Sequence, residues 1–270
     1  MATKTSTPKD EHIEIVELKY AKMAAFIVSS TPLYLHRFSQ KARQELLYPE
    51  RKKNKAALER ALKHDPLKEF RECCYRTADK DSPTLFHIPC GMLNRAMADA
   101  AIDLPGSVKK AKIQRMVQIV DLNIALFGIP CLDMKMVRSS DMNRTPDVRT
   151  RPLFNEWAAK VTLGFPVGIL TQQDVGSLLQ AAGMLIGLGD WRPQRGGSNG
   201  KFKVVNQNDE ELLRIVGAQG RAAQLLAFEN PSMADDETAE LYDWFQEQLS
   251  LREQNVEAFI GEDEEREAAQ

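Results

Sequence analysis

A glycine-rich segment over residues 183–203 holds the side chains best suited to contact a ligand. Six of its first eighteen residues are glycine, which adopts positive φ without strain and lets backbone amides approach a ligand closely. Amides, cations and an aromatic ring together suit a nucleic-acid backbone and a stacked base. The segment offers Trp191, Arg192, Arg195, Lys201 and Lys203 for this purpose. The alternative is a mobile surface loop in which Trp191 packs into the core, and both interpretations stay open at this point.

Two further clusters of cations indicate contacts with phosphate groups. Short basic runs can follow a phosphate backbone, and arginine matches the geometry of phosphate better than lysine does. A solvated helix face is the alternative for such a run. The first cluster comprises Arg37, Lys41, Arg43, Arg51, Lys52 and Lys53. The second lies in a polar segment predicted to be a loop, 139–152, and comprises Arg144, Arg149 and Arg151.

The sequence lacks the spacing of common catalytic and metal-binding motifs. Its four histidines, at 12, 36, 64 and 87, are far apart, and no Cys or His pair has zinc spacing. Neither a phosphate-binding P-loop nor a Gly-x-Ser-x-Gly elbow occurs. We therefore expect no metal, no cofactor and no catalytic residue, and favour a protein that is not an enzyme.

The charge of the chain is divided unevenly between two regions. The net charge is −2 over 270 residues. Residues 207–270 contain seventeen acidic residues and four arginines, so residues 1–206 have a net charge of +11. A basic body predicts a polyanionic partner, whereas the alternative is that the helical surfaces simply differ in charge. The sequence thus favours nucleic acid as the ligand of the body.

Composition and cysteine usage indicate a globular cytoplasmic protein. With 43% hydrophobic and 27% charged residues, the chain has an ordinary globular composition. Residues 1–9 lack the apolar core of a signal peptide, and no run reaches the ~18 apolar residues of a membrane span. The four cysteines lack metal-ligand spacing, so we expect buried free thiols in a reducing compartment and no membrane association.

Strand and helix patterns interleave along the chain, which predicts an α+β fold. The predicted strands are 16–28, 70–76, 85–88, 124–127, 132–137, 157–170 and 201–205. The predicted helices are 40–47, 92–101, 108–120, 172–184, 210–217, 221–228 and 236–259, the fourth of them capped by Thr171 and Asp174. Residues 50–64 are interpreted as a solvated basic helix or as an insertion that becomes ordered on binding.

These patterns divide the chain into four parts. Residues 1–11 are a polar arm predicted to be disordered, 12–206 the basic α+β body, 207–259 an acidic helical extension and 260–270 a disordered tail. The long helix of the extension has an apolar seam that either docks a protein partner or packs against its own core. That seam comprises Leu241, Trp244, Phe245 and Leu249.

Two motifs make the sequence resemble an uncharacterised family of bacteriophage and prophage proteins. The first is Ser-Thr-Pro-Leu-Tyr-Leu-His-Arg-Phe-Ser at 30–39, followed by Lys-Ala-Arg at 41–43. The second is Gly-Leu-Gly-Asp-Trp-Arg-Pro at 187–193, followed by Gly-Lys-Phe at 200–202. The resemblance spans about residues 15–205, and the acidic region after 206 is less clearly shared.

The glycine-rich loop, placed between a helix and a last strand, is also similar to that of the RAMP superfamily. This superfamily includes RNA-binding backbone subunits of CRISPR surveillance complexes. The resemblance implies a ferredoxin-like core, a bound single strand and copies that stack along it. The chain departs from it through the basic insertion at 50–64 and the acidic extension. An RNA-cleaving member, with His36 as general base, is the enzymatic alternative.

The leading expectation is therefore a phage-type protein that binds nucleic acid, preferably single-stranded, and oligomerises along it without catalysing a reaction. The acidic extension is expected to compete with nucleic acid or to bind a neighbouring subunit or protein partner. The second hypothesis is a phage assembly factor or host-defence inhibitor that acts through the acidic helix. Whether DNA or RNA is preferred stays open, because contacts with the 2′-hydroxyl leave no trace in composition.

Overall fold

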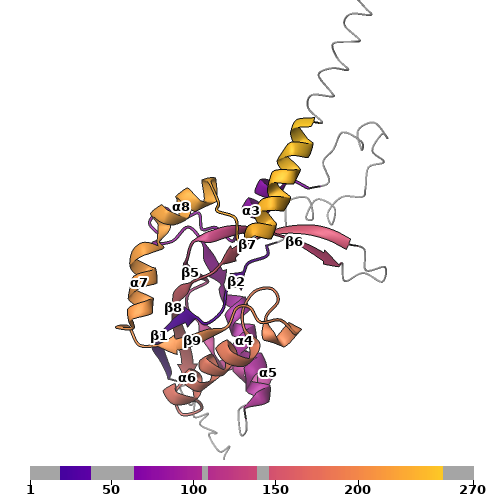
Figure 1. The fold of residues 1–270 in the computed structure, drawn as a ribbon. Helices are drawn as coiled ribbons and strands as arrows, with labels where there is room; N and C mark the ends of the chain where they lie inside the picture. The colour runs from indigo at the N-terminus through magenta and orange to yellow at the C-terminus, as the bar shows by residue number, and fades with distance from the viewer. Residues whose placement is uncertain (1–18, 38–63, 105–108, 139–145, 252–270) are drawn as a thin grey trace, which may run out of the picture.

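The fold is a mixed α+β arrangement of two antiparallel sheets with helices packed around them (Figure 1). The computed structural model describes residues 19–37, 64–104, 109–138 and 146–251. The predicted arm at 1–11, helix at 40–47 and tail at 260–270 lie outside these ranges, as does all of the 50–64 segment except His64. The predicted α+β class is confirmed.

The larger sheet forms the centre of the molecule and has the order β3-β5-β8-β1-β9. β1 lies between β8 and β9, and both pairings are antiparallel. β4 and β5 pair in turn with the other edge of β8, and β3 pairs with β5. The strands are β1 (Tyr20–Ser29), β3 (His87–Pro89), β4 (Gln118–Ile119), β5 (Asn123–Phe127), β8 (Ala158–Pro166) and β9 (Phe202–Val205).

One face of this sheet is covered by α4 (Cys90–Asp103) and α6 (Gln172–Ala181). Ile27 of β1 and Val161 of β8 are fully buried in the core beneath them. The predicted capping box at the start of α6 is present, with Thr171 Oγ1 accepting from the Asp174 amide at 3.1 Å. After α6 the helix widens into the π-turn η1 (Ala182–Ile186), which leads into the glycine-rich segment.

The opposite face is covered by α7 (Glu210–Ala218), whose Leu212 and Ile215 pack on Val28 and Ala158. α8 (Arg221–Glu229) follows. Its Gln224 is fully buried and bonds to backbone atoms of the body, accepting from Leu85 N at 2.7 Å and donating to Leu126 O at 2.7 Å. Both predicted helices are therefore present. The domain boundary at 206 stays a prediction, while α7 and α8 are packed against the body.

The smaller sheet is a long hairpin with one added strand, in the order β2-β7-β6. α3 (Pro66–Cys73) and a helix over residues 236–251 pack against it through an apolar cluster that includes Phe70, Leu132, Met134 and Leu241. In Figure 1 the second of these helices rises from the hairpin. The strands are β2 (Leu33–Tyr34), β6 (Pro130–Arg138) and β7 (Pro146–Phe154).

Three predicted elements need correction. The strand predicted at 70–76 is wrong, because Asp65 caps a helix that begins at Pro66 and buries Phe70 and Cys73. The loop predicted at 139–152 is wrong from residue 146 onward, since β7 pairs with β6 over nine residues. The helix predicted at 108–120 is the shorter α5 (Lys110–Met116), because the chain then turns to pair with β8 as β4.

The cysteines and the helices bear on two further predictions from the sequence. Cys73 and Cys74 are buried free thiols, as predicted, while Cys90 and Cys131 are half-buried. Burial is the main cause that raises the pKa of Cys73 to about 12. Across the described ranges, every helix is too short or too polar to cross a lipid bilayer.

Candidate functional site

The glycine-rich segment is held against the rest of the body by backbone hydrogen bonds. Gly200 N donates to Pro32 O at 2.7 Å, and Asp190 N donates to Tyr34 O at 3.2 Å. Gly200 has φ +72°, and a Cβ built there would lie 1.9 Å from the Leu188 carbonyl oxygen. No other residue fits this position, since the left-handed backbone and the close approach both require glycine. The glycines therefore fold this loop tightly against the segment that follows β1.

Trp191 is presented to solvent by this loop. Its side chain is 63% exposed, so the alternative in which it anchors the core is wrong. Its backbone φ is +55°, a conformation that bulky residues rarely adopt. Backbone strain of this kind persists only where the surrounding structure imposes it, and it gathers at functional sites. An exposed tryptophan held in this way is suited to stacking on a planar ligand.

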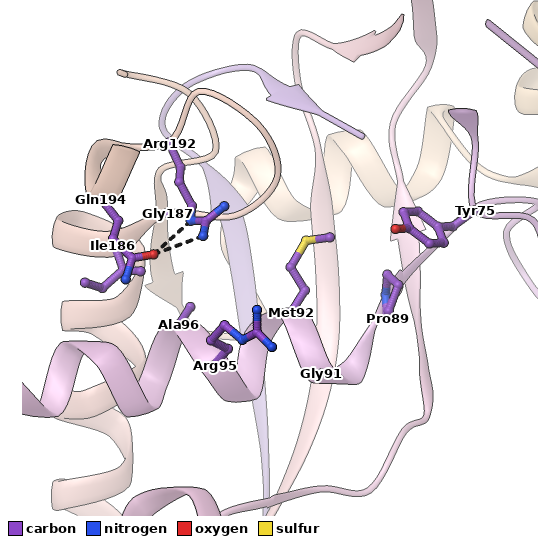
Figure 2. A pocket seen from close by; sticks show the side chains of 10 residues that line it. All are labelled: Tyr75, Pro89, Gly91, Met92, Arg95, Ala96, Ile186, Gly187, Arg192 and Gln194. Carbon is purple, nitrogen blue, oxygen red and sulfur yellow. Dashed lines mark hydrogen bonds between the residues drawn. The ribbon is translucent and has the colours of Figure 1, made fainter. Parts of the chain in front are cut away.

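A pocket of about 370 Å³ lies between α4 and the loop, and Arg192, the residue after Trp191, lines it. Its floor is the first turns of α4, its near wall is the loop, and its far end is formed by Tyr75 and Pro89 (Figure 2). The lining contains two arginines and no acidic residue. The lining residues are Tyr75, Pro89, Gly91, Met92, Arg95, Ala96, Ile186, Gly187, Arg192 and Gln194.

Arg192 is fixed in the pocket wall by the loop itself. Its Nη1 donates to Gly189 O at 2.9 Å, and its Nε and Nη2 donate to Gln194 Oε1 at 3.1 and 3.0 Å. Gln194 in turn donates to Asp99 Oδ2 at 2.6 Å. Asp99 is a buried residue of α4 that also forms an ion pair with Lys110. The network ties the loop to α4 and sets the direction of the Arg192 guanidinium.

The pocket is electropositive. Figure 2 shows the guanidinium groups of Arg95 and Arg192 on opposite sides of the space, facing each other. Burial and the charges of Arg195 and Arg95 lower the pKa of Arg192, against the charges of Asp190 and Asp99, which raise it. Like charges that are gathered around one space favour an anion inside it.

A second polar network lies directly behind the loop. His36 Nδ1 donates to Asp190 Oδ2 at 3.0 Å, and Arg151 Nη1 donates to the same oxygen at 3.4 Å. The guanidinium of Arg151 also lies 4.9 Å from the centre of the Tyr34 ring. Burial raises the pKa of Asp190, but the His36 hydrogen bond and the charges of His36 and Arg151 outweigh it and hold that pKa below its usual value. Asp190 is thus an ionised, already paired carboxylate.

Of the predicted binding residues, the structure brings Trp191, Arg192 and Arg195 together. Arg37 lies outside the lining of the pocket, and its amide donates to Cys73 O at 3.0 Å. Lys201 follows the loop, and its amide donates to Thr31 Oγ1 at 2.9 Å. Six of the predicted residues lie outside the described ranges: Lys41, Arg43, Arg51, Lys52, Lys53 and Arg144.

The remaining predicted cations are placed away from the pocket or already paired. Lys203 forms an ion pair with Glu211 at 2.8 Å. Arg151 is buried and paired with Asp190. Arg149 lies on the hairpin, opposite Lys135 in register. We therefore leave these three residues out of the site proposed below.

Sequence reasoning missed Arg95 and Tyr75. Arg95 is the single cation of α4 and lies outside the clusters of cations from which the binding residues are predicted. Tyr75 lies within the strand predicted at 70–76, whereas in the structure it follows the end of α3. The signal in the sequence is one arginine in a helix that carries no other cation.

The predicted apolar seam of the acidic extension is divided by the structure. Leu241 packs into the hairpin cluster, and Phe245 and Leu249 are half-buried. Trp244 is 57% exposed. The seam is therefore partly a core contact and partly an open surface.

The comparisons with known proteins add no family to this picture: the sequence matches no protein-family model, and no curated protein matches it. Within the described ranges, no group of three or more His, Cys, Asp or Glu residues is arranged to hold a metal ion. The case for a function therefore depends on the geometry of the loop and its pocket.

Proposed function

We propose that this protein binds single-stranded nucleic acid through the glycine-rich loop. The observation that carries the proposal is the exposed Trp191, next in sequence to Arg192, which lines a pocket together with Arg95. Proteins that hold single strands combine a cationic groove for the backbone with aromatic rings for the bases. The excess of positive charge in residues 1–206 supports a polyanionic ligand.

The strand order supports the ferredoxin-like core that the resemblance to RAMP proteins implies. Along the chain the central elements follow as β1, α4, β5, β8, α6 and β9, and in the sheet the strands lie as β5-β8-β1-β9. Two interleaved strand–helix–strand units with antiparallel neighbours define the split βαβ arrangement. The β6–β7 hairpin is then an insertion between the second and third core strands. As part of the proposal, the protein is phage-type and cytoplasmic, and copies assemble along the strand.

Fluorescence anisotropy with labelled single- and double-stranded DNA and RNA at two salt concentrations tests the proposal. We expect tight binding to a single strand and an affinity that falls with salt, because released counterions drive the binding. A folded protein that binds none of these ligands, or binds independently of salt, would contradict it.

The two exposed tryptophans provide a matched pair of variants. Trp191→Asn is expected to weaken binding by about five- to a hundredfold, since stacking on one base contributes roughly 1–3 kcal/mol. Asparagine tolerates the left-handed backbone at this position, which limits any effect on the loop. Trp244→Asn removes the other exposed tryptophan from a distant helix and is expected to leave nucleic-acid affinity within about twofold. Equal effects of the two variants would contradict a site at the loop.

A second candidate function is favoured by Trp244 itself. The helix over 236–251 carries five acidic residues and no basic one, with Trp244 exposed among them. Such a surface fits a basic protein partner, as expected of an assembly factor or a host-defence inhibitor. Absence of nucleic-acid binding by the folded protein would favour this second function.

A further inference from the structure

We propose that the pocket between α4 and the loop holds one nucleotide, with its phosphate between Arg95 and Arg192 and its base at the end formed by Tyr75 and Pro89. This inference deepens the proposed function and rests on it. It also assigns Arg95 and Tyr75 to a ligand, although neither stands out in the sequence.

The phosphate end is defined by two arginines from different elements. Arg95 comes from α4 and Arg192 from the loop, and their guanidinium groups face each other across the space (Figure 2). Within the described ranges, Arg95 makes no hydrogen bond or ion pair of its own, so its donors are available to a ligand. Guanidinium groups bind phosphate oxygens through charge-assisted hydrogen bonds.

The acidic side chains nearest to Arg192 are engaged elsewhere. Asp99 forms an ion pair with Lys110, and Asp190 is shared by His36 and Arg151. Asp190 and Asp99 offset part of the charge of Arg192, but neither carboxylate lines the pocket, where positive charge remains. An anionic ligand satisfies it without displacing an existing ion pair.

The other end of the pocket has the chemistry of a base-binding surface. Tyr75 and Pro89 close it, and the Met92 side chain lies between that end and Arg95 (Figure 2). The Tyr75 hydroxyl donates to His36 O at 3.4 Å, which fixes the direction of the ring. Aromatic side chains and other apolar surfaces accept a base by stacking, whichever base it is.

The size of the pocket limits the ligand to a single residue of a chain. At about 370 Å³ it lies near the lower end of the 300–1,000 Å³ that is typical of small-molecule sites. The combination of one cationic end and one apolar, aromatic end matches a nucleotide. An acidic peptide would use the cationic end and leave the other unused.

Isothermal titration calorimetry of the full chain with AMP, adenosine and inorganic phosphate tests the inference. We expect AMP to bind and each of its two parts alone to bind at least about tenfold more weakly, since each engages one end only. Inorganic phosphate that binds as tightly as AMP would overturn the assignment of the base, and adenosine that does so would overturn the assignment of the phosphate.

Arg95→Gln and Lys160→Gln form the matched pair of variants. Arg95→Gln removes one charged phosphate contact and is expected to weaken AMP binding about tenfold or more. Lys160 is exposed on β8, on the sheet face away from α4, so Lys160→Gln removes the same charge and is expected to change AMP affinity by less than about twofold. Equal losses from the two variants would overturn the inference.

The same measurements separate this inference from the proposed function. If oligonucleotides bind but AMP does not bind up to about 10 mM, and Arg95→Gln leaves oligonucleotide affinity unchanged, the pocket inference fails while the proposed function stands. If AMP binds and no oligonucleotide does, the inference of a nucleotide site stands and single-strand binding fails. If neither binds to the folded protein, both are overturned.

Discussion

The loop beside α4 and the β6–β7 hairpin are both rich in cations, and the structure uses these cations in opposite ways. On the hairpin, Lys135 is paired with Asp235 at 2.6 Å and Glu237 at 2.9 Å, which join the acidic helix to the sheet. At the loop, Arg95 and Arg192 face each other across a pocket whose lining has no acidic residue. Positive charge in the sequence therefore marks two different roles, one in holding the fold together and one in offering a site to an anion.

The largest loss of stability is expected where the glycine-rich loop is tightly packed. Gly200→Ala places a Cβ against the Leu188 carbonyl at a left-handed backbone position, so we expect a loss of about 3 kcal/mol or more in the free energy of unfolding. Urea denaturation followed by circular dichroism measures it. The control is Gly176→Ala, which meets no atom within 4 Å inside α6 and is expected to stabilise by up to about 1 kcal/mol. Equal stability of the two variants would show that the loop is not packed as described.

The burial of Gln224 tests whether α8 is part of the body. Gln224→Ala leaves Leu126 O and Gly128 O, its acceptors at 2.7 and 2.9 Å, without this donor. We expect a loss of about 2–3 kcal/mol, because unpaired buried polar groups keep their full desolvation cost. Gln207→Ala changes an exposed glutamine in the turn before α7 and should shift the urea midpoint very little. A small effect of Gln224→Ala would support a separate extension that begins at residue 207.

The packing of α7 and α8 also determines how competition by the acidic tail is tested. A cut at residue 206 would remove buried contacts such as those of Gln224, so the informative truncation ends at Leu251 and removes 252–270, with seven acidic residues and two arginines. If the tail competes with nucleic acid, anisotropy should show an affinity about two- to tenfold higher at low salt, with the difference fading as salt screens it. Unchanged or lower affinity would contradict the competition.

A smaller loss of stability is expected where the acidic helix over 236–251 contacts the β6–β7 hairpin. Hydrogen bonds donated by Lys135 and Thr238 lower the pKa of Asp235 to about 2. Because the folded pKa is depressed, the stabilisation is present above about pH 4 and is lost as the pH falls towards 2. Asp235→Asn should cost under about 1 kcal/mol at pH 7, since the pair is exposed, and the difference from wild type in urea denaturation should shrink over that pH range. A constant difference would contradict this assignment.

The smallest change in nucleic-acid affinity is expected for a substitution of Lys203. This residue tests whether a cation that is already paired can still bind the ligand. Because Lys203 is held by Glu211 on α7, Lys203→Gln should change nucleic-acid affinity by less than about twofold. The same anisotropy titration used for Trp191→Asn measures it. A loss as large as that of Trp191→Asn would extend the binding surface onto the sheet edge.

Local signals in the sequence were sufficient for several elements. The capping box of Thr171 and Asp174 located the start of α6, and the apolar spacing in 210–228 located α7 and α8. These features are local, because caps and amphipathic periods involve residues within one or two turns. The same reasoning failed at β7, whose polar first half forms a strand only because β6 lies beside it.

The sequence by itself determined the class of the fold, the glycine-rich loop and the concentration of positive charge before residue 206. Only the tertiary structure decided which cations are available. Arg151 is paired with Asp190, which is distant in sequence, and Lys203 is paired with Glu211 of α7, so neither is available to a ligand. Arg95 is available, because it faces Arg192 across a pocket. The physical reason is that the availability of a charge depends on the charges around it in space, and composition cannot specify those neighbours.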